Sequence, residues 1–250
     1  MIIFPMAGLS SRFFNAGYSV PKFMLDLDGR TVFDHVISGF HRYFGRELLV
    51  FVCRSDFGTP EFIRTHLRAL GLTNDDFCIV ELDQETRGQA DTVMRALDAL
   101  PKSHEGLTIF NVDSIRHDFC HLQLDTIRSS GYLEVIEAAG DHWSFVLPFE
   151  SQKVEVGRVR AVAEKSRISN FCSTGLYYFD QTLTFKELYH ATYKSNSSAQ
   201  VILEEYVAPI YETGLQQGLQ FSYFVLKPEL IDFCGIPSEY EALRKRKIGR

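Results

Sequence analysis

The sequence predicts an α/β fold, a three-layer αβα sandwich in which helices cover both faces of a mostly parallel, Rossmann-like mixed sheet. Three observations lead to this prediction. Over residues 1–115, short apolar runs typical of buried parallel strands alternate with segments of helical periodicity. Residues 116–250 change to strand-like runs without full helices between them, which indicates a mixed or antiparallel extension of the sheet. No repeat or low-complexity linker separates the two halves, so we expect a single domain over 1–250.

The first half alternates strand and helix in order. Its helices are marked by local signals: Val32, Phe33, Val36 and Ile37 recur at helical spacing, and Thr59 precedes Pro60, a pairing of N-cap and first helical position. We therefore expect strands at 2–6, 23–27, 48–53, 77–82 and 107–112, and helices at 31–44, at 59–70 and from after Thr92 to about 100.

The second half is predicted to extend the sheet and to end in helices. Pro237 follows Ile236 and opens the last helix. We expect strands at 132–138, 143–147, 159–164, 173–179 and 219–225, and helices at 183–193, at 201–217 and after 236.

Composition bounds the possible functions. The 250 residues are 45% hydrophobic and carry a formal net charge of −6, which argues against general nucleic-acid binding. No apolar run approaches the roughly 20 residues of a membrane helix. The five cysteines are dispersed and form no CxxC motif, as expected of reduced thiols. We expect a cytoplasmic protein without nucleic-acid or membrane partners, and a homo-oligomer stays open.

The turn after the first predicted strand has the character of a polyphosphate cradle. An apolar strand breaks into small residues, and cations follow at Arg12 and, after Pro21, at Lys22. Small residues let the backbone approach an anion, and the N–H groups that begin a helix point toward it. A pair of ordinary surface cations is the alternative. The residues predicted to bind nucleotide here are Ala7, Gly8, Leu9, Ser10 and Ser11.

Three further places carry residues suited to the same chemistry. Asp113 follows the strand predicted at 107–112, where its carboxylate can hold Mg²⁺ or simply cap a turn. The amide of Gln84 can donate and accept at once, as reading a pyrimidine edge requires, or belong to a polar loop. Glu164 and Lys165 can contact hydroxyls and a phosphate of an acceptor, or form an exposed ion pair. His117 and His121 are expected to be surface residues.

The order of these motifs resembles the sugar-nucleotidyltransferase family over nearly the whole chain. Its pattern Gly-Gly-x-Gly-Thr-Arg, a spacer, then Pro-Lys, is similar to residues 7–12 and 21–22, with Ala7 and Ser10 in place of glycines. Residues 232–240 resemble a later Asp-x-Gly-Thr-Pro segment, with Cys234 as an extra residue and Ile236 in place of Thr.

The resemblance assigns roles to residues of this sequence. It implies Arg12, Lys22 and Lys165 as catalytic residues, and Asp113 with Asp232 as ligands of Mg²⁺. Gln84, Gly88 and Gln89 would bind the nucleotide together with the turn at 7–11. Glu164, Lys165, Thr174 and Gly175 would bind the acceptor.

The resemblance also implies a GT-A type fold and a reaction. An NTP (CTP, UTP or dTTP) and a phosphorylated acceptor, a sugar 1-phosphate or a small phospho-alcohol or phospho-amide, would give an NDP-activated product and pyrophosphate. The product would serve capsule or surface polysaccharide synthesis. Alternatives stay open: a CTP-specific enzyme acting on phosphocholine or phosphoglutamine, a GT-A glycosyltransferase, or a non-catalytic nucleotide-binding regulator. A glycosyltransferase normally carries Asp-x-Asp, whereas this chain has Asn111-Val112-Asp113.

Overall fold

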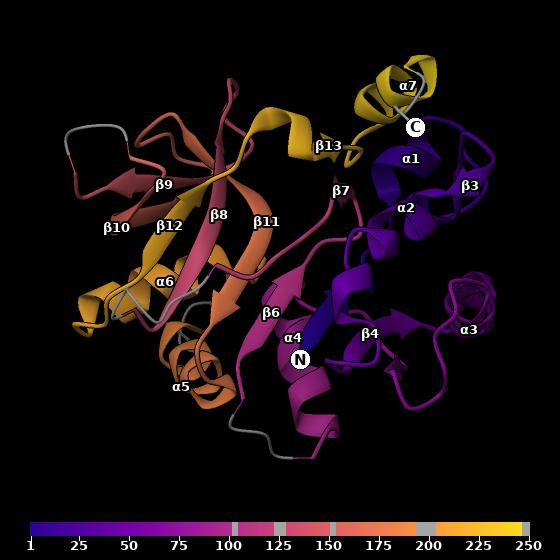
Figure 1. Ribbon diagram of the computed structural model, residues 1–250, viewed down its shortest axis with the longest axis horizontal. Helices are drawn as coiled ribbons and strands as arrows, with labels where there is room; N and C mark the ends of the chain where they lie inside the picture. Colours follow the sequence, from indigo (N-terminus) through magenta and orange to yellow (C-terminus); the bar gives the residue numbers. More distant parts are fainter. Residues whose placement is uncertain (102–104, 123–128, 151–153, 194–203, 247–250) are drawn as a thin grey trace. The chain divides into compact units, whose positions relative to one another are not determined.

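The computed structural model of the protein describes residues 1–101, 105–122, 129–150, 154–193 and 204–246 (Figure 1). The chain divides into two compact units, each assembled from separated segments. Unit 1 comprises Met1–Ile3, Thr86–Phe110 and Leu122–Lys227. Unit 2 comprises Phe4–Glu85, Asn111–His121 and Pro228–Arg250. A single domain with halves at 1–115 and 116–250 stays a prediction.

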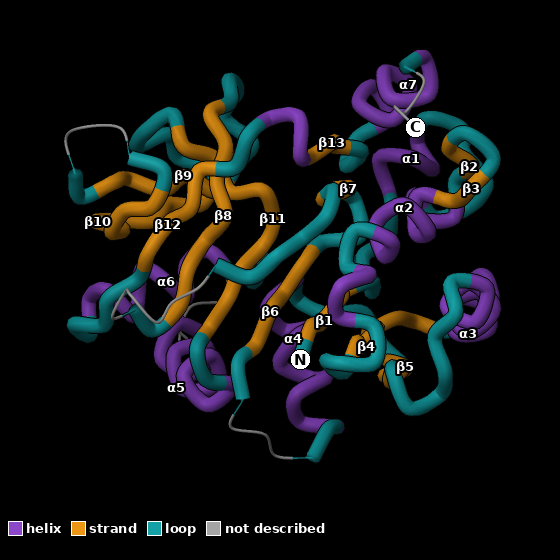
Figure 2. Tube along the Cα trace, in the orientation of Figure 1, coloured by secondary structure: helices purple, strands orange, loops and turns teal. Residues whose placement is uncertain are grey.

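A mixed sheet forms the centre of unit 1 (Figure 2). Its strand order is β1-β6-β11-β8-β12-β10-β9, with Ile2 and Ile3 of β1 parallel to β6. Strand β12 is parallel to β8, whereas β11 is antiparallel to β6 and β8, and β10 to β12 and β9. The predicted α/β fold with a mixed sheet is therefore confirmed, and its later strands pair antiparallel except for β12 with β8. The strands are β1 (Ile2–Pro5), β6 (Leu107–Phe110), β8 (Gly131–Glu137), β9 (Ser144–Pro148), β10 (Val156–Glu164), β11 (Phe171–Phe179) and β12 (Ser222–Val225).

Within its described residues, unit 1 has the helices α4 (Gln89–Ala99), α5 (Thr182–Tyr193) and α6 (Ala208–Gln216). The buried Tyr211 holds α6 against the sheet, because its hydroxyl lies 2.8 Å from the carbonyl oxygen of Tyr178 and its ring lies 4.5 Å from that of Phe179. The helix predicted at 201–217 begins only at Ala208, and residues 201–203 lie outside the described residues. Within the described ranges, every helix is too short or too polar to cross a bilayer.

Unit 2 is built around two parallel strands and a phenylalanine-rich core. Strands β4 and β5 pair in register from Leu49 with Phe77 onward. The ring of Phe4 stacks on that of Phe51 at 5.1 Å, and the buried Phe33 packs beside them. Burial of such large aromatic side chains supplies most of the driving force for this unit. Its strands are β2 (Asp26–Leu27), β3 (Arg30–Thr31), β4 (Leu49–Arg54), β5 (Phe77–Leu82), β7 (Ser114–Arg116) and β13 (Ile231–Phe233). Its helices are α1 (Ser11–Asn15), η1 (Lys22–Met24), α2 (Val32–Ser38), η2 (His41–Tyr43), η3 (Asp56–Gly58), α3 (Thr59–Ala69), η5 (Pro228–Leu230) and α7 (Pro237–Lys245).

Local predictions in unit 2 fail where tertiary contacts intervene. The strand predicted at 23–27 is a 3₁₀ turn followed by the two-residue strand β2. The helix predicted at 31–44 ends at Ser38, because the carbonyl oxygen of Gly39 accepts the N–H of Phe119 at 2.8 Å rather than an N–H of a further helical turn. The chain at Arg116 packs against Gly39, where an added Cβ would lie 1.9 Å from the carbonyl oxygen of Arg116. Thr59 is the first residue of α3 rather than its N-cap, a place taken by Gly58 in a left-handed conformation.

A short antiparallel ladder was not predicted from the sequence. Strand β13 pairs with β7, so that Asp232 lies opposite Ile115 and Phe233 opposite Ser114. One step further on, the backbone N–H of Cys234 donates to the carbonyl oxygen of Asp113 at 2.9 Å. The ladder therefore brings the end of the chain beside the residues that follow β6.

Candidate active site

The turn predicted to bind phosphate follows β1 in unit 2 and is open. Gly8 and Leu9 are exposed, and a Cβ on Gly8 would meet no atom within 4 Å. Ser10 has φ 52° and ψ 27°, the left-handed conformation that favours glycine, so a serine keeps the backbone shape of the glycine pattern. Its hydroxyl oxygen accepts the backbone N–H of Lys22 at 3.3 Å, which compensates part of the strain. The space above Gly8 suits a ligand.

Two cations flank this turn, and they differ in their surroundings. Arg12 lies in α1, is exposed, and pairs with no carboxylate among the described residues. Lys22 follows Pro21 as the first residue of η1, and its ammonium nitrogen lies 2.6 Å from Oδ2 of Asp113. Both members of this pair keep 24% of their side-chain surface exposed. The tertiary structure thus joins two residues predicted to take part in one site.

The carboxylate of Asp113 has room beside it. A Cβ on Gly235 would lie 3.2 Å from Oδ2 of Asp113, so the glycine leaves space that a side chain would fill. Asp232, the second predicted metal ligand, is engaged elsewhere: it accepts hydrogen bonds from His117 at 3.0 Å and Arg246 at 2.9 Å. The hydrogen bond from His117 lowers the pKa of Asp232 below its ordinary value. Across the described residues, no three His, Cys, Asp or Glu side chains converge as a metal site.

A cavity of about 310 Å³ adjoins the turn within unit 2. Arg54 lies in its wall, with its guanidinium 2.5 Å from Asp56 and 3.2 Å from Glu85. Phe57 is 55% exposed at φ 57°, a strained conformation for a bulky side chain, and its ring stacks on Phe14 at 5.4 Å. The residues that line the cavity are Met6, Ala7, Gly8, Leu9, Ser11, Phe14, Asn15, Pro21, Phe23, Arg54, Asp56, Phe57 and Thr59.

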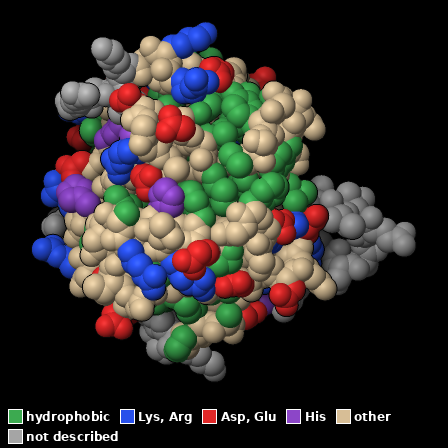
Figure 3. Space-filling view, turned by 90° about the vertical axis from the view of Figure 1, so that its right-hand side faces the viewer, with side chains coloured by type: hydrophobic (Ala, Val, Ile, Leu, Met, Phe, Trp, Pro, Cys, Tyr) green, Lys and Arg blue, Asp and Glu red, His purple; other side chains and the backbone are tan. Residues whose placement is uncertain are grey.

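Figure 3 shows hydrophobic side chains gathered in a broad patch on one face of the molecule.

Sequence reasoning did not single out Arg54 or Phe57. Arg54 ends a strand that looks like any buried apolar strand, and the left-handed backbone of Phe57 has no signature in a single sequence. The neighbouring Gly58 was the only available signal, because Gly before Thr59-Pro60 indicates a tight entry into the helix.

The residues predicted to bind the acceptor lie in unit 1. Glu164 ends β10 and accepts a short hydrogen bond from the hydroxyl of Ser144, and burial raises the pKa of its carboxyl group. Lys165 follows with φ 52°. Its ammonium group donates to the hydroxyl of Tyr206, lies 4.3 Å from the centre of that ring and is 3.8 Å from Glu204. The two neighbours thus differ in their surroundings: Glu164 is a partly buried carboxyl group, and Lys165 is a half-exposed cation.

Thr174 and Gly175 form a bulge in β11, where the pairing with β8 shifts between Ser173 and Tyr177. The hydroxyl of Thr174 is buried and donates to the carboxylate of Glu134 at 3.2 Å. Gly175 has φ 87° and its N–H donates to the hydroxyl of Ser173. The Thr174 side chain therefore points into the protein interior and bonds there. An acceptor contact at this bulge would involve the backbone.

The polar loop after β5 is divided between the units. Gln84 is exposed in unit 2, whereas Gly88 and Gln89 lie in unit 1, where Gln89 is the first residue of α4. The backbone of Gly88 has φ 150° and lies against Glu205: an added Cβ would sit 2.5 Å from the carbonyl oxygen of Glu205. The sequence predicted a role for Gly88 but not for Glu205, the residue that packs against it. Glu205 comes shortly after residues 194–203, which the structure does not describe.

Comparison with known proteins identifies the family. The chain is similar to the solved structure of a nucleoside-diphosphate-sugar pyrophosphorylase from Vibrio cholerae RC9, with 38% identity and a TM-score of 0.90. The match covers 98% of this chain and 100% of that one. The chain belongs to the sugar-phosphate nucleotidylyltransferase-like family. No protein-family model matches the chain, and the search of curated proteins found no match.

Two more distant structures share the fold of this nucleotidyltransferase relative. A UTP-bound UGPase from Acinetobacter baumannii is 16% identical, with a TM-score of 0.70 over 98% of this chain and 91% of that one. The inositol-1-phosphate CTP transferase from T. maritima is 17% identical, with a TM-score of 0.69 over 100% of this chain and 97% of that one. At these identities the likeness concerns the fold alone, and it agrees with the predicted nucleotidyltransferase architecture.

Proposed function

We propose that the protein is a nucleotidyltransferase that joins an NTP to a phosphorylated small-molecule acceptor and releases pyrophosphate. The observation that carries this proposal is the pair of Lys22 and Asp113, 2.6 Å apart beside the open turn at Gly8. Phosphoryl chemistry requires a cation for phosphate oxygens near a carboxylate for a metal ion, and this pair supports the proposal because it would supply both groups. Membership of the nucleotidylyltransferase-like family supports the same reaction.

Mg²⁺ fits the residues around Asp113. Mg²⁺ in such enzymes uses one or two carboxylates and completes its coordination with phosphate oxygens and water. Asp113 offers the first carboxylate, and Gly235 leaves room beside it. Asp232 would become a second ligand only by giving up its contacts with His117 and Arg246. When bound, Mg²⁺ would neutralise charge on the phosphates.

Each side chain of the proposed site would have its own role in the reaction. An oxygen of the acceptor phosphate would attack the α-phosphorus of the NTP in line, and the bond to the bridging β-oxygen would break with its electrons leaving on pyrophosphate. A phosphate monoester is nucleophilic at neutral pH, so no strong general base is needed. Arg12 and Lys22 would stabilise the charge on the triphosphate, Lys165 would bind the acceptor phosphate, and Glu164 would contact its polar groups.

Substrate identity is the finer part of the proposal. The exposed turn at 7–11, the 310 Å³ cavity beside it and Gln84 suit an NTP, with CTP, UTP and dTTP as candidates. The acceptor would be a sugar 1-phosphate or a small phospho-alcohol or phospho-amide such as phosphocholine or phosphoglutamine. We expect the product to be a cytoplasmic precursor of capsule or surface polysaccharide.

A pyrophosphate-release screen tests the proposal. Four NTPs with MgCl₂ are combined with a panel of sugar 1-phosphates, phosphocholine and phosphoglutamine, with the Lys22→Ala variant as control. We expect release with at least one pair and none above background with the variant. NTP binding by calorimetry without release from any pair, at high enzyme concentration, would favour a non-catalytic regulator and contradict the proposal.

A further inference from the structure

The three consecutive residues Glu204, Glu205 and Tyr206 of unit 1 contact two elements that the proposed function assigns to different substrates. Glu205 contacts the loop before α4, which carries Gly88. Its neighbours Glu204 and Tyr206 contact Lys165. We define residues 204–206 as the bridging segment.

Glu205 is fixed to the loop by its backbone. Its N–H donates to the carbonyl oxygen of Arg87 at 2.9 Å, and its carbonyl oxygen accepts the N–H of Ala90 at 2.8 Å. Gly88 lies between these contacts, and its lack of a Cβ permits the close approach. The glycine in this loop is therefore required by the bridging segment, independently of any nucleotide.

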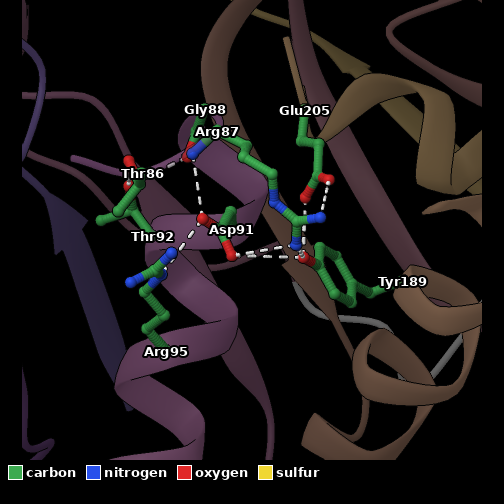
Figure 4. A network of polar contacts seen from close by, with 8 residues as sticks. All are labelled: Thr86, Arg87, Gly88, Asp91, Thr92, Arg95, Tyr189 and Glu205. Atoms are coloured by element: carbon green, nitrogen blue, oxygen red, sulfur yellow. Dashed lines mark hydrogen bonds and ion pairs between the residues drawn. The ribbon is translucent and has the colours of Figure 1, made fainter. Parts of the chain in front are cut away.

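The side chain of Glu205 adds a second set of contacts, drawn in Figure 4. The side chain is only 6% exposed; its carboxylate lies 3.1 Å from the guanidinium of Arg87 and accepts the hydroxyl of Tyr189 at 2.7 Å. Arg87 in turn contacts Asp91, which accepts the backbone N–H of Arg87 at 2.9 Å and the guanidinium of Arg95 at 3.1 Å. The carbonyl oxygen of Gly88 accepts the hydroxyl of Thr92 at 2.9 Å. The loop is thus held by side chains from α4, α5 and the bridging segment.

Glu204 and Tyr206, the residues on either side of Glu205, contact Lys165. The ammonium group lies over the ring of Tyr206 at 4.3 Å and donates to its hydroxyl, and Tyr206 donates to Glu204. The backbone of Tyr206 is fixed as well, because its carbonyl oxygen accepts the hydroxyl of Tyr193 at 2.5 Å. Lys165 itself has left-handed backbone, so its side chain direction depends on these contacts.

We propose that the bridging segment is a positioning element that sets the Gly88–Gln89 loop and Lys165 together, with Glu205 acting on the nucleotide side and Tyr206 on the acceptor side. This inference rests on the proposed nucleotidyltransferase function. The pair joins the half-exposed guanidinium of Arg87 to the buried carboxylate of Glu205. It contributes little net stability, because desolvation of the carboxylate offsets the attraction, whereas its fixed geometry orients the loop. Small displacements of substrate-binding groups are costly to turnover, so such an element has a kinetic signature.

Two conservative variants separate the two sides. Glu205→Gln keeps the size and the backbone contacts but removes the charge that holds Arg87. We expect the KM for the NTP to rise about tenfold, with the KM for the acceptor changed less than about twofold. Tyr206→Phe keeps the ring and removes only the hydroxyl that contacts Lys165. We expect it to raise the KM for the acceptor about fivefold and leave that for the NTP unchanged.

A matched control breaks another ion pair in the same unit. Lys186 of α5 pairs with Asp98 of α4 at 2.6 Å, on the exposed side of these helices. Lys186→Ala should leave both KM values unchanged. Equal shifts in both KM values for both variants, or a lower melting temperature with unchanged KM values, would overturn the proposal.

A measurement without substrate keeps this inference separate from the proposed function. In hydrogen–deuterium exchange of the free protein, we expect Glu205→Gln to raise exchange of the amides at 87–92 and Tyr206→Phe to leave them unchanged. If the wild type turns over no substrate pair, the function fails while this exchange difference still supports positioning. Unchanged exchange at 87–92 in Glu205→Gln would contradict the positioning role itself.

Discussion

The Lys22–Asp113 pair of unit 2 and the Arg87–Glu205 network of unit 1 are both ion pairs, but they are built differently. Lys22 and Asp113 make a single contact and each keeps 24% of its side chain exposed. Glu205 and Asp91 are each 6% exposed and have several partners, among them Arg87, Arg95 and Tyr189. A single, partly exposed contact can exchange for ligands, whereas buried carboxylates with several partners hold one geometry. The Lys22–Asp113 pair therefore suits ligand binding and catalysis, and the Arg87–Glu205 network suits the positioning of a loop.

Removal of the Lys22 ammonium group, whose contact with Asp113 can exchange for a ligand, should have the largest effect on activity. Lys22→Ala is expected to lower kcat/KM by at least about 100-fold, because the variant lacks a charge that would stabilise the transferring phosphoryl group. The melting temperature should stay near that of the wild type, because one partly exposed pair contributes little stability. Steady-state kinetics and a circular-dichroism melt measure the two effects. Retained activity with a normal melt would exclude the role given to Lys22.

Two glycines should separate packing from ligand binding. Gly88→Ala is expected to cost about 3 kcal/mol of unfolding free energy, because the new Cβ would lie 2.5 Å from the backbone of Glu205. Gly8→Ala meets open space and should cost less than about 0.5 kcal/mol, yet raise the KM for the NTP. Urea unfolding and kinetics of both variants provide the measurement. Equal stabilities would contradict the close packing of Gly88 against the backbone of Glu205.

The pH dependence of stability should report the buried network. Burial alone would raise the pKa of Asp91, but the backbone N–H of Arg87 and the charge of Arg95 outweigh it and lower the pKa. A lowered folded-state pKa contributes stability that is complete above the ordinary value of about 4 and is lost as the pH falls through the folded-state value. Asp91→Asn should therefore be less stable at pH 7 and lose less stability on acidification below about pH 4. Parallel losses of both proteins in urea unfolding between pH 7 and 3 would refute this account.

The exposed pair of Lys186 and Asp98 should have the smallest effect. Lys186→Ala is expected to change the unfolding free energy by less than about 0.5 kcal/mol, because water screens the pair and its side chains lose entropy on pairing. Chemical denaturation with and without 0.5 M NaCl checks the value. A loss above about 1 kcal/mol would mean that exposure does not separate the two kinds of ion pair.

Local patterns identified many of the elements but few of the contacts. Strands β4 and β5 were predicted within a residue, because an apolar run between polar loops reports burial directly. The β7–β13 ladder was missed, because each strand has only three residues and neither alternates clearly. The helix at 31–44 was predicted too long, because its end depends on the chain of Arg116 at Gly39.

The candidate site shows the same division. Lys22 and Asp113 were each proposed from their local setting, and the structure joins them. Arg54, Arg87 and Glu205 were not proposed, because each looks like an ordinary surface charge in the sequence. The role of Asp232 as a metal ligand stays a prediction, since its observed partners are His117 and Arg246.

The sequence by itself determined the alternation of strands and helices, the small-residue turn with its cations and the resemblance to nucleotidyltransferases. These features depend on neighbouring residues, so a periodicity or a short motif records them. The tertiary structure alone decided which charges meet: Lys22 with Asp113, 91 positions along the chain, and His117 with Asp232, 115 positions along. Such pairs depend on strand order and on the burial of both partners, and periodicity reports that a residue is buried but not what it is buried against.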